Sequence, residues 1–156
     1  MNYQNDAEVE IKDIIYDSNS SGFADVVHGK YVVHVHRDHT DTELVMTIFK
    51  CPKGATGMCS EKLLEVTEPL DCQRFLTDAT GPWHMFAPAT DKRNVCAETK
   101  GEFEFASAKI EARFFEKYMT VEEGHYRVKS LYHLPGANMD IKNLRGCIEL
   151  DFDIYA

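Results

Sequence analysis

Three segments near the end of the chain decide the fold: CAETKGEFEF at residues 96–105, VEEGHYRVKSLYHL at 121–134 and RGCIELDFDI at 145–154. Each combines strand-like composition with a nearby glycine turn, and two of them carry a cysteine. In the last segment apolar and acidic residues alternate, which is the pattern of a strand with one buried face. The segments predict a mostly β, antiparallel protein with disulfide bonds. The bulky apolar stretch between two of them suggests a container for a hydrophobic ligand.

The overall composition predicts one globular domain spanning residues 1–156. The chain is 44% hydrophobic and 28% charged, and its formal net charge at pH 7 is −9. A surface this acidic would repel nucleic-acid phosphates and anionic membranes, so we expect no nucleic-acid partner. No apolar run approaches the roughly 20 residues that a membrane-spanning helix requires.

Five cysteines is a high number for this length, and four of them lie within residues 51–96. They form no CxxC motif and no Cys–His spacing typical of a zinc site, so we favour disulfides and a secreted or lumenal protein. The polar start of the chain, MNYQNDAEVEIKD, lacks the pattern of a signal peptide, so we expect a mature chain. The triplet Asn19-Ser20-Ser21 is a candidate glycosylation site.

The first third of the chain predicts three strands: residues 7–17, a second with its core at 30–38, and 42–51. On the second strand His34 and His36 would share a face. We favour a solvated face, with a metal site or a pH-sensitive strand as alternatives. The third strand is apolar on both sides, so it is either buried on both or has one side on a core and the other on a cavity.

The middle of the chain is expected to hold one or two short helices within residues 60–79, with Ser60 as N-cap of a helix over EKLLEV. The stretch TGPWHMFAPAT at 80–90 carries the only tryptophan between prolines, which disfavours a regular element. This apolar loop is either a plug over the core or the rim of a ligand site. Residues 106–121 fit a helix and an irregular strand about equally.

The sequence contains no GxSxG nucleophile elbow, no P-loop and no HExxH zinc-protease motif. His84, His125 and His133 have no evident nucleophile partner. A Cys–His pair using the odd thiol is the one catalytic arrangement left open. We therefore expect a non-enzymatic protein without a cofactor.

Several of these motifs form an ordered set from about residue 45 to residue 155. The set consists of Phe49-Lys50-Cys51, Gly57, Cys59, Cys72, Cys96, Lys100-Gly101-Glu102-Phe103, Gly124-His125-Tyr126-Arg127-Val128 and Gly146-Cys147-Ile148. In order and spacing it resembles the ganglioside-activator (sphingolipid activator) family, including insect chemosensory relatives of the CheB type.

The resemblance implies a β-cup, in which an antiparallel sheet curls around an apolar cavity that holds one lipid. It implies the disulfides Cys51–Cys59 and Cys72–Cys96. In the family the last-strand cysteine pairs with one near the N-terminus, which this sequence lacks, so Cys147 is expected to be unpaired. The family's mobile apolar loops would fall on residues 81–86 and 114–121.

We therefore expect a secreted carrier of a lipid or other hydrophobic small molecule, in a chemosensory or lipid-transfer role. Transient membrane contact and delivery to a receptor or hydrolase would accompany that role. The expected cavity wall consists of Leu44, Met46, Ile48, Phe103, Phe105, Tyr126, Val128, Ile148, Leu150 and Phe152, and the expected rim of Trp83, Phe86, Phe114, Phe115 and Met119. The alternative is a protein-interaction module of the same fold with a filled core, which binds a receptor or hydrolase through its apolar loops.

Overall fold

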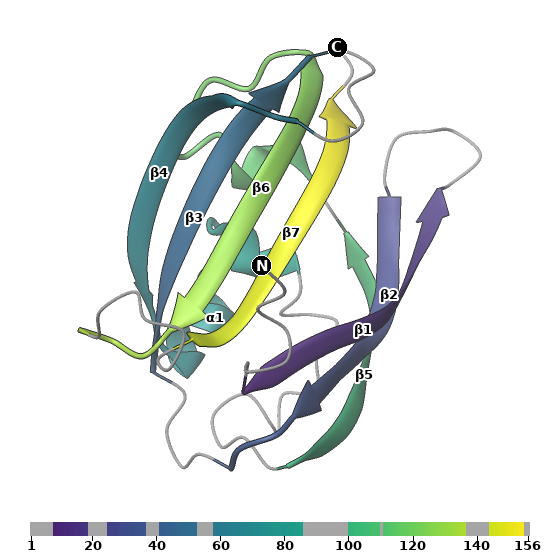
Figure 1. The fold of residues 1–156 in the computed structure, drawn as a ribbon, viewed down its shortest axis with the longest axis vertical. Helices are drawn as coiled ribbons and strands as arrows, with labels where there is room; N and C mark the ends of the chain where they lie inside the picture. The colour runs from purple at the N-terminus through teal and green to yellow at the C-terminus, as the bar shows by residue number, and fades with distance from the viewer. Residues whose placement is uncertain are drawn as a thin grey trace. The chain divides into compact units, whose positions relative to one another are not determined.

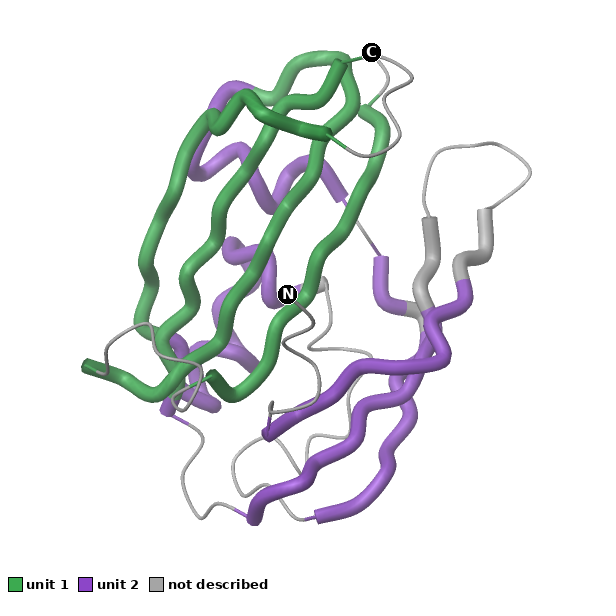
Figure 2. Tube along the Cα trace, viewed as in Figure 1, with its two compact units in different colours: residues 1–7, 42–69, 121–156 green, residues 8–41, 70–120 purple. Residues whose placement is uncertain are grey.

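The structure is a computed structural model that describes residues 8–18, 25–36, 41–52, 58–85, 100–109, 111–136 and 144–154. The chain divides into two compact units that are interleaved in sequence (Figure 2). Unit 1 comprises residues 1–7, 42–69 and 121–156, and unit 2 comprises residues 8–41 and 70–120. The described part of each unit contains an antiparallel sheet, so the mostly β prediction is confirmed.

The sheet of unit 1 has the strand order β4-β3-β6-β7 (Figure 1). Its strands are β3 (Thr42–Cys51), β4 (Glu61–Leu70), β6 (Gly124–His133) and β7 (Leu144–Ile154). β3 pairs antiparallel with β6, and β6 pairs antiparallel with β7. The observed bounds of β3 are those predicted from its sequence. β6 lies within the predicted segment 121–134, and β7 begins one residue before the predicted segment 145–154.

Alternation along these strands gives the sheet one apolar side. Leu44, Met46 and Ile48 on β3 are buried, while the residues between them are half-buried. The register places Ile48 beside Val128, and Val128 beside Leu150. Directly opposite residues of antiparallel strands project to the same side, so the three side chains form a continuous row across the sheet.

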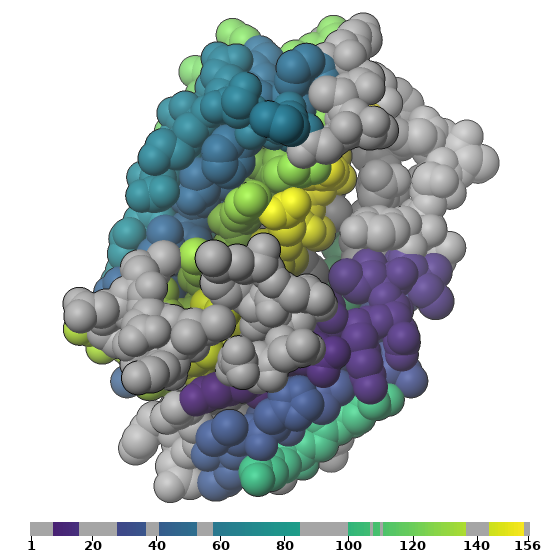
Figure 3. Space-filling model, in the orientation of Figure 1, coloured from purple at the N-terminus to yellow at the C-terminus, as the bar shows by residue number. Residues whose placement is uncertain are grey.

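The sheet of unit 2 has the strand order β1-β2-β5, and Figure 3 shows these strands as adjoining purple, blue and green bands. The strands are β1 (Val9–Ser18), β2 (Asp25–Val33) and β5 (Gly101–Lys109). A bulge interrupts β1 at Asp13, whose φ is 52°. Phe105 and Ala108 form a small buried core with Ile11 and Tyr31 packed against it.

Short helical segments precede and follow β5 in the sequence. Helix α1 (Cys72–Thr77) begins at Asp71, whose carboxylate accepts a hydrogen bond from the Arg74 backbone N–H at 2.7 Å. The 3-10 helices η2 (Pro82–Met85) and η5 (Ala112–Phe114) lie on either side of β5 in the sequence. Helix α1 confirms the expectation of a short helix within residues 60–79.

The predicted helix over residues 61–66, with Ser60 as its N-cap, is wrong, because these residues begin β4. The segment EKLLEV consists mostly of good helix formers, which explains the misleading pattern. In the structure burial along the segment has a period of two, since Leu64, Val66 and Glu68 are less exposed than their neighbours. Pairing with β3 overrides the local propensity.

Two strands end where no local sequence pattern marks an end. β2 stops at Val33, so the prediction that His34 and His36 lie on one face of a strand is wrong. Just beyond the end of β2, the His34 backbone N–H donates to the carbonyl of Glu8, the residue before β1, at 2.8 Å. In residues 106–121, β5 continues to Lys109 and is followed by η5 and turns, so both alternatives hold in part.

Candidate ligand-binding surface

Most of the predicted wall residues lie on one side of the unit 1 sheet, which we call the apolar face. They are Leu44, Met46 and Ile48 on β3, Tyr126 and Val128 on β6, and Ile148, Leu150 and Phe152 on β7. Ile148 and Phe152 are half-buried, whereas the others are buried. The face therefore provides an apolar lining that stays partly accessible along β7.

At one end of the apolar face, the polar groups of Tyr126 and Lys50 both have hydrogen-bond partners. The rings of Tyr126 and Phe152 stack with centroids 6.1 Å apart, and the Tyr126 hydroxyl donates to the Glu122 carbonyl at 2.8 Å. Lys50 is opposite Tyr126 in the register, and its Nζ donates to Glu122 Oε2 at 3.1 Å. This hydrogen bond raises the pKa of Lys50. The contacts at this end are those of an ordinary strand terminus.

The other end of the apolar face contains a buried cation. Arg145 lies at a bulge near the start of β7, and its Nη1 donates to Thr42 Oγ1 at 2.6 Å. Arg145 is 4% exposed and Thr42 is 8% exposed. Thr42 alternates in step with Leu44, so it lies on the apolar side of β3. Because β6 separates β3 from β7, the guanidinium reaches across the end of the face to make this bond.

Two hydroxyl groups of β6 lie on the same face near Arg145. Tyr132 is opposite Leu44 on β3 and opposite Gly146 on β7, and Ser130 is opposite Met46. Burial raises the pKa of the Tyr132 phenol to about 12. Within the described ranges, neither hydroxyl has a hydrogen-bond partner. The apolar face thus has an apolar middle and a polar end.

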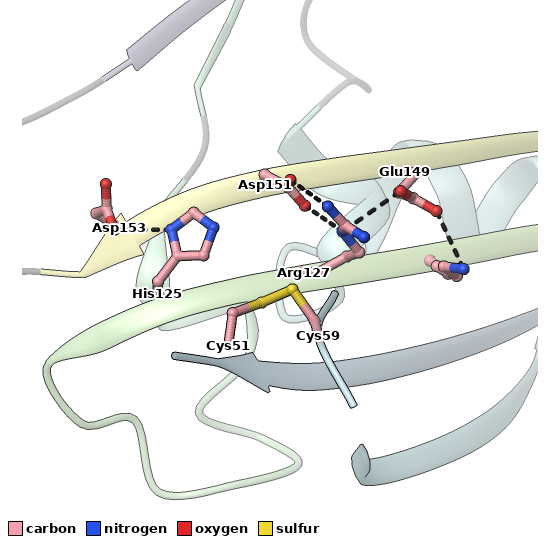
Figure 4. A network of polar contacts seen from close by, with 8 residues as sticks. Cys51, Cys59, His125, Arg127, Glu149, Asp151 and Asp153 are labelled. Carbon is pink, nitrogen blue, oxygen red and sulfur yellow. Dashed lines mark hydrogen bonds and ion pairs between the residues drawn. A yellow bond between two sulfur atoms is a disulfide. The ribbon is translucent and has the colours of Figure 1, made fainter. Parts of the chain in front are cut away.

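The opposite side of the sheet carries ion pairs (Figure 4). Arg127 donates from Nε and Nη2 to the two carboxylate oxygens of Asp151, both at 2.7 Å, and its Nε lies 3.4 Å from Glu149. The hydrogen bonding between them lowers the pKa of Asp151 and raises that of Arg127. His125 Nδ1 lies 2.8 Å from Asp153 Oδ1. The carboxylates are exposed, so this side has the character of a solvated sheet surface.

The remaining predicted wall residues belong to unit 2. Phe103 and Phe105 alternate along β5 and therefore share a side of its sheet. The Phe103 ring stacks on Tyr31 with centroids 5.3 Å apart, and Phe105 is part of the buried core of that unit. Met119, predicted at the rim, is half-buried.

Three predicted rim aromatics of unit 2 are buried: Trp83 is 1% exposed, Phe114 3% and Phe115 2%. The Trp83 indole N–H donates to the Asp78 carbonyl at 3.2 Å, and the Arg74 guanidinium lies 4.7 Å from the ring centroid. These aromatics resemble a plug more than an exposed patch, which weighs against their use as a docking surface for a protein partner.

The cysteines agree with the expected pattern where the structure describes them. Cys51 and Cys59 form the predicted disulfide. Cys72 is also in a disulfide, and its predicted partner Cys96 lies outside the described residues. Cys147 is free, as expected, and burial followed by the charge of Glu149 raises its pKa.

Two predicted site residues, Phe86 and the glycosylation site Asn19, lie outside the described residues. In the part of the chain that is described, no group of three or more His, Cys, Asp and Glu side chains is placed to hold a metal ion. His34 Nε2 lies 3.3 Å from Glu10 Oε2 instead. None of the described helices has the length and apolar composition needed to cross a membrane.

Three residues at the polar end of the apolar face were not anticipated from the sequence: Thr42, Tyr132 and Arg145. Thr42 and Tyr132 could have been found by extending the alternation that identifies Leu44 and Val128. Arg145 had no such signal, because it lies at a β-bulge, where alternation is interrupted.

The described residues define the apolar face but do not show a closed cavity around it. The lipid cavity and the contacts of the individual residues with a ligand therefore stay predictions. The chain matches no protein-family model and no curated protein, so the likeness to the ganglioside-activator family depends on its motifs alone.

Proposed function

We propose that the protein is a secreted, non-enzymatic carrier of a lipid or another hydrophobic small molecule. The apolar face is the observation that carries the proposal, because residues from the three neighbouring strands β3, β6 and β7 combine there into one apolar surface. Ile148 and Phe152, on the edge strand β7, remain partly accessible on that surface. The Cys51–Cys59 disulfide supports an oxidising, extracellular setting.

Binding would be driven by removing an apolar chain from water. Each buried CH₂ contributes about 0.8 kcal/mol, so a chain of about ten carbons contributes about 8 kcal/mol before the costs of association are subtracted. The apolar middle of the face is suited to this kind of contact because it presents branched and aromatic side chains without a charge. No covalent chemistry is required of the protein.

Delivery of the ligand is the second part of the proposal. A chemosensory or lipid-transfer role requires the carrier to meet a membrane, a receptor or a hydrolase and then to leave it. The net charge of −9 disfavours lasting adsorption to an anionic membrane, which agrees with transient contact.

Native mass spectrometry of the protein from a eukaryotic secretion host tests the carrier function. We expect a co-purifying hydrophobic molecule, close to one equivalent, that is released on denaturation and identified in the organic extract. A protein that is empty, and that also refuses fatty acids, fatty alcohols and phospholipids when they are added, would refute the proposal.

A pair of variants tests whether the apolar face is the binding surface. Ile148→Thr replaces an ethyl group on the apolar face with a hydroxyl, and Val45→Thr replaces a methyl group on the opposite side, where Val45 is also half-buried. We expect Ile148→Thr to weaken the binding of a fluorescent fatty-alcohol probe by about fivefold, which corresponds to about 1 kcal/mol. Equal effects of the two variants would locate the binding elsewhere.

A further inference from the structure

Two buried imidazole nitrogens have no hydrogen-bond partner in the described part of the chain: Nδ1 of His84 and Nε2 of His133. The His84 ring lies beside an aromatic ring, with its centroid 6.1 Å from that of Phe114. His133 lies beside a carboxylate instead, with Nε2 3.5 Å from Glu43 Oε1. A buried polar atom without a hydrogen-bond partner is unusual and costly, so the arrangement of His133 and Glu43 needs a physical explanation.

These two side chains come from directly opposite positions on neighbouring strands. His133 is the last residue of β6 and Glu43 the second residue of β3, and the antiparallel register pairs them. His133 is 3% exposed, whereas the Glu43 side chain is 31% exposed. The described residues supply Glu43 with no other hydrogen bond or ion pair. The pair is therefore held by two paired strands, and solvent reaches it from the side of Glu43.

The hydrogen bond at the other ring nitrogen decides where the neutral His133 ring carries its proton. Nδ1 lies 3.1 Å from the Leu134 carbonyl oxygen, which can only accept a hydrogen bond, so Nδ1 carries the proton. Nε2 then presents a lone pair to the Glu43 carboxylate, which also has only lone pairs to offer. Two facing acceptors repel each other unless a proton or a metal cation lies between them. A hydrogen bond from Nδ1 to a carbonyl is also the usual way of orienting a metal-binding histidine.

The separation of 3.5 Å fits a shared metal ion better than a shared proton. Hydrogen bonds between a nitrogen and a carboxylate oxygen are usually about 2.7–3.2 Å long. The pair of His125 Nδ1 and Asp153 Oδ1, at 2.8 Å, is within that range. A tetrahedral ion with bonds of about 2.0–2.2 Å to nitrogen and oxygen holds those two atoms about 3.3–3.5 Å apart. Nε2 of His133 and Oε1 of Glu43 are therefore spaced as two ligands of one such ion.

We propose that His133 Nε2 and Glu43 Oε1 bind one divalent transition-metal ion such as Zn²⁺. An imidazole with a carboxylate suits such an ion, whereas Ca²⁺ and Mg²⁺ prefer sites made of oxygen atoms. Water would fill the remaining coordination positions, because the described residues place no third His, Cys, Asp or Glu side chain there. The bound ion would join β3 to β6 at one end of the sheet. Glu43 alternates out of step with Leu44, so the site lies on the side opposite the apolar face and is independent of the carrier function.

Isothermal titration calorimetry of the chelator-treated protein with zinc chloride at neutral pH tests this site. The wild-type protein should bind one equivalent of Zn²⁺. Loss of an outer partner of a metal ligand already lowers affinity about 10–100-fold, so His133→Gln and Glu43→Gln should each weaken binding at least about tenfold. His125→Gln is the matched control, because it removes an imidazole that is hydrogen-bonded to a carboxylate on the same side of β6. Cys147→Ser removes the free thiol as a competing ligand, and both controls should leave the affinity within about twofold.

A wild-type protein that binds no Zn²⁺ at millimolar concentration would overturn the proposal and leave His133 and Glu43 as an ion pair. Zinc binding that is unchanged in Glu43→Gln would overturn it as well, because the ion would then be bound by other residues. His133 is buried, so His133→Gln can fail to fold. Glu43→Gln changes a partly exposed side chain without changing its size, and in that case its zinc affinity decides the question.

Discussion

Replacing Asp78 with asparagine is expected to destabilise the segment that holds Trp83. The Asp78 carboxylate accepts hydrogen bonds from the Thr80 hydroxyl at 2.6 Å and the Thr80 backbone N–H at 2.9 Å, and it lies 3.3 Å from Arg74 Nε. Its backbone carbonyl accepts the Trp83 indole N–H. The bonds from Thr80, with a smaller contribution from Arg74, lower the pKa of Asp78 from 3.8 to about 2.

The magnitude and the pH dependence follow from this pKa. The drop from 3.8 to about 2 corresponds to about 2.4 kcal/mol at about 1.36 kcal/mol per pKa unit, and the 25% exposure of the side chain makes this an upper value. Asparagine keeps one acceptor oxygen, so we expect a loss of about 1–2 kcal/mol at neutral pH. Since the folded-state pKa is the lower one, the stabilisation is complete above pH 3.8 and disappears as the pH falls to about 2.

Urea unfolding of the wild type and Asp78→Asn, followed by tryptophan fluorescence from neutral pH down to about pH 2, measures this difference. The gap in unfolding free energy should close as the solution is acidified. Asp41→Asn removes an exposed carboxylate elsewhere and should give no such trend. A gap below about 0.5 kcal/mol at neutral pH, or one that is independent of pH, would refute the reasoning.

Three further variants test other parts of the structure. Cys59→Ser opens a disulfide that joins residues separated by 8 in the sequence and should cost about 2.5 kcal/mol, and an unchanged urea midpoint would contradict this. Arg127→Gln should cost about 1 kcal/mol, and in a double-mutant cycle Asp151→Asn should add little once the arginine is gone; full additivity would mean that the pair contributes no coupling. Gly81→Ala would place a Cβ 2.1 Å from the Trp83 ring and should cost about 1–3 kcal/mol with a shift in tryptophan emission, and a stable variant with unchanged emission would show that the contact is looser than described.

Strands with regular alternation could be located from the sequence, and strands without it could not. The last strand was predicted to within one residue of its observed start because Ile148, Leu150 and Phe152 alternate with acidic residues. Residues 61–70 were not, because EKLLEV is built from helix formers and becomes a strand only by pairing with β3. Local composition predicts an element correctly only where pairing with a distant strand favours the same kind of element.

In the candidate site, too, some residues could be predicted from the sequence and others could not. Its apolar members were predicted because period-two alternation assigns each residue to a side before the partner strand is known. The bond between Arg145 and Thr42 joins residues 103 apart in the sequence, and it depends on the strand order and on a bulge. Neither of these has a local signature, so the charged end of the face could emerge only from the folded sheet.

The two sides of the unit 1 sheet depend on each other through the strand register. A shift of β6 by one residue would carry Arg127 and Lys129 onto the apolar face and turn Val128 outward. Each exposed ion pair contributes little stability, but burying an unpaired charge is very costly, so the pairs with Asp151 and Glu149 act chiefly by excluding the wrong register. The polar side therefore fixes the composition of the other side without touching it, because it keeps the row of apolar side chains on one face of the sheet.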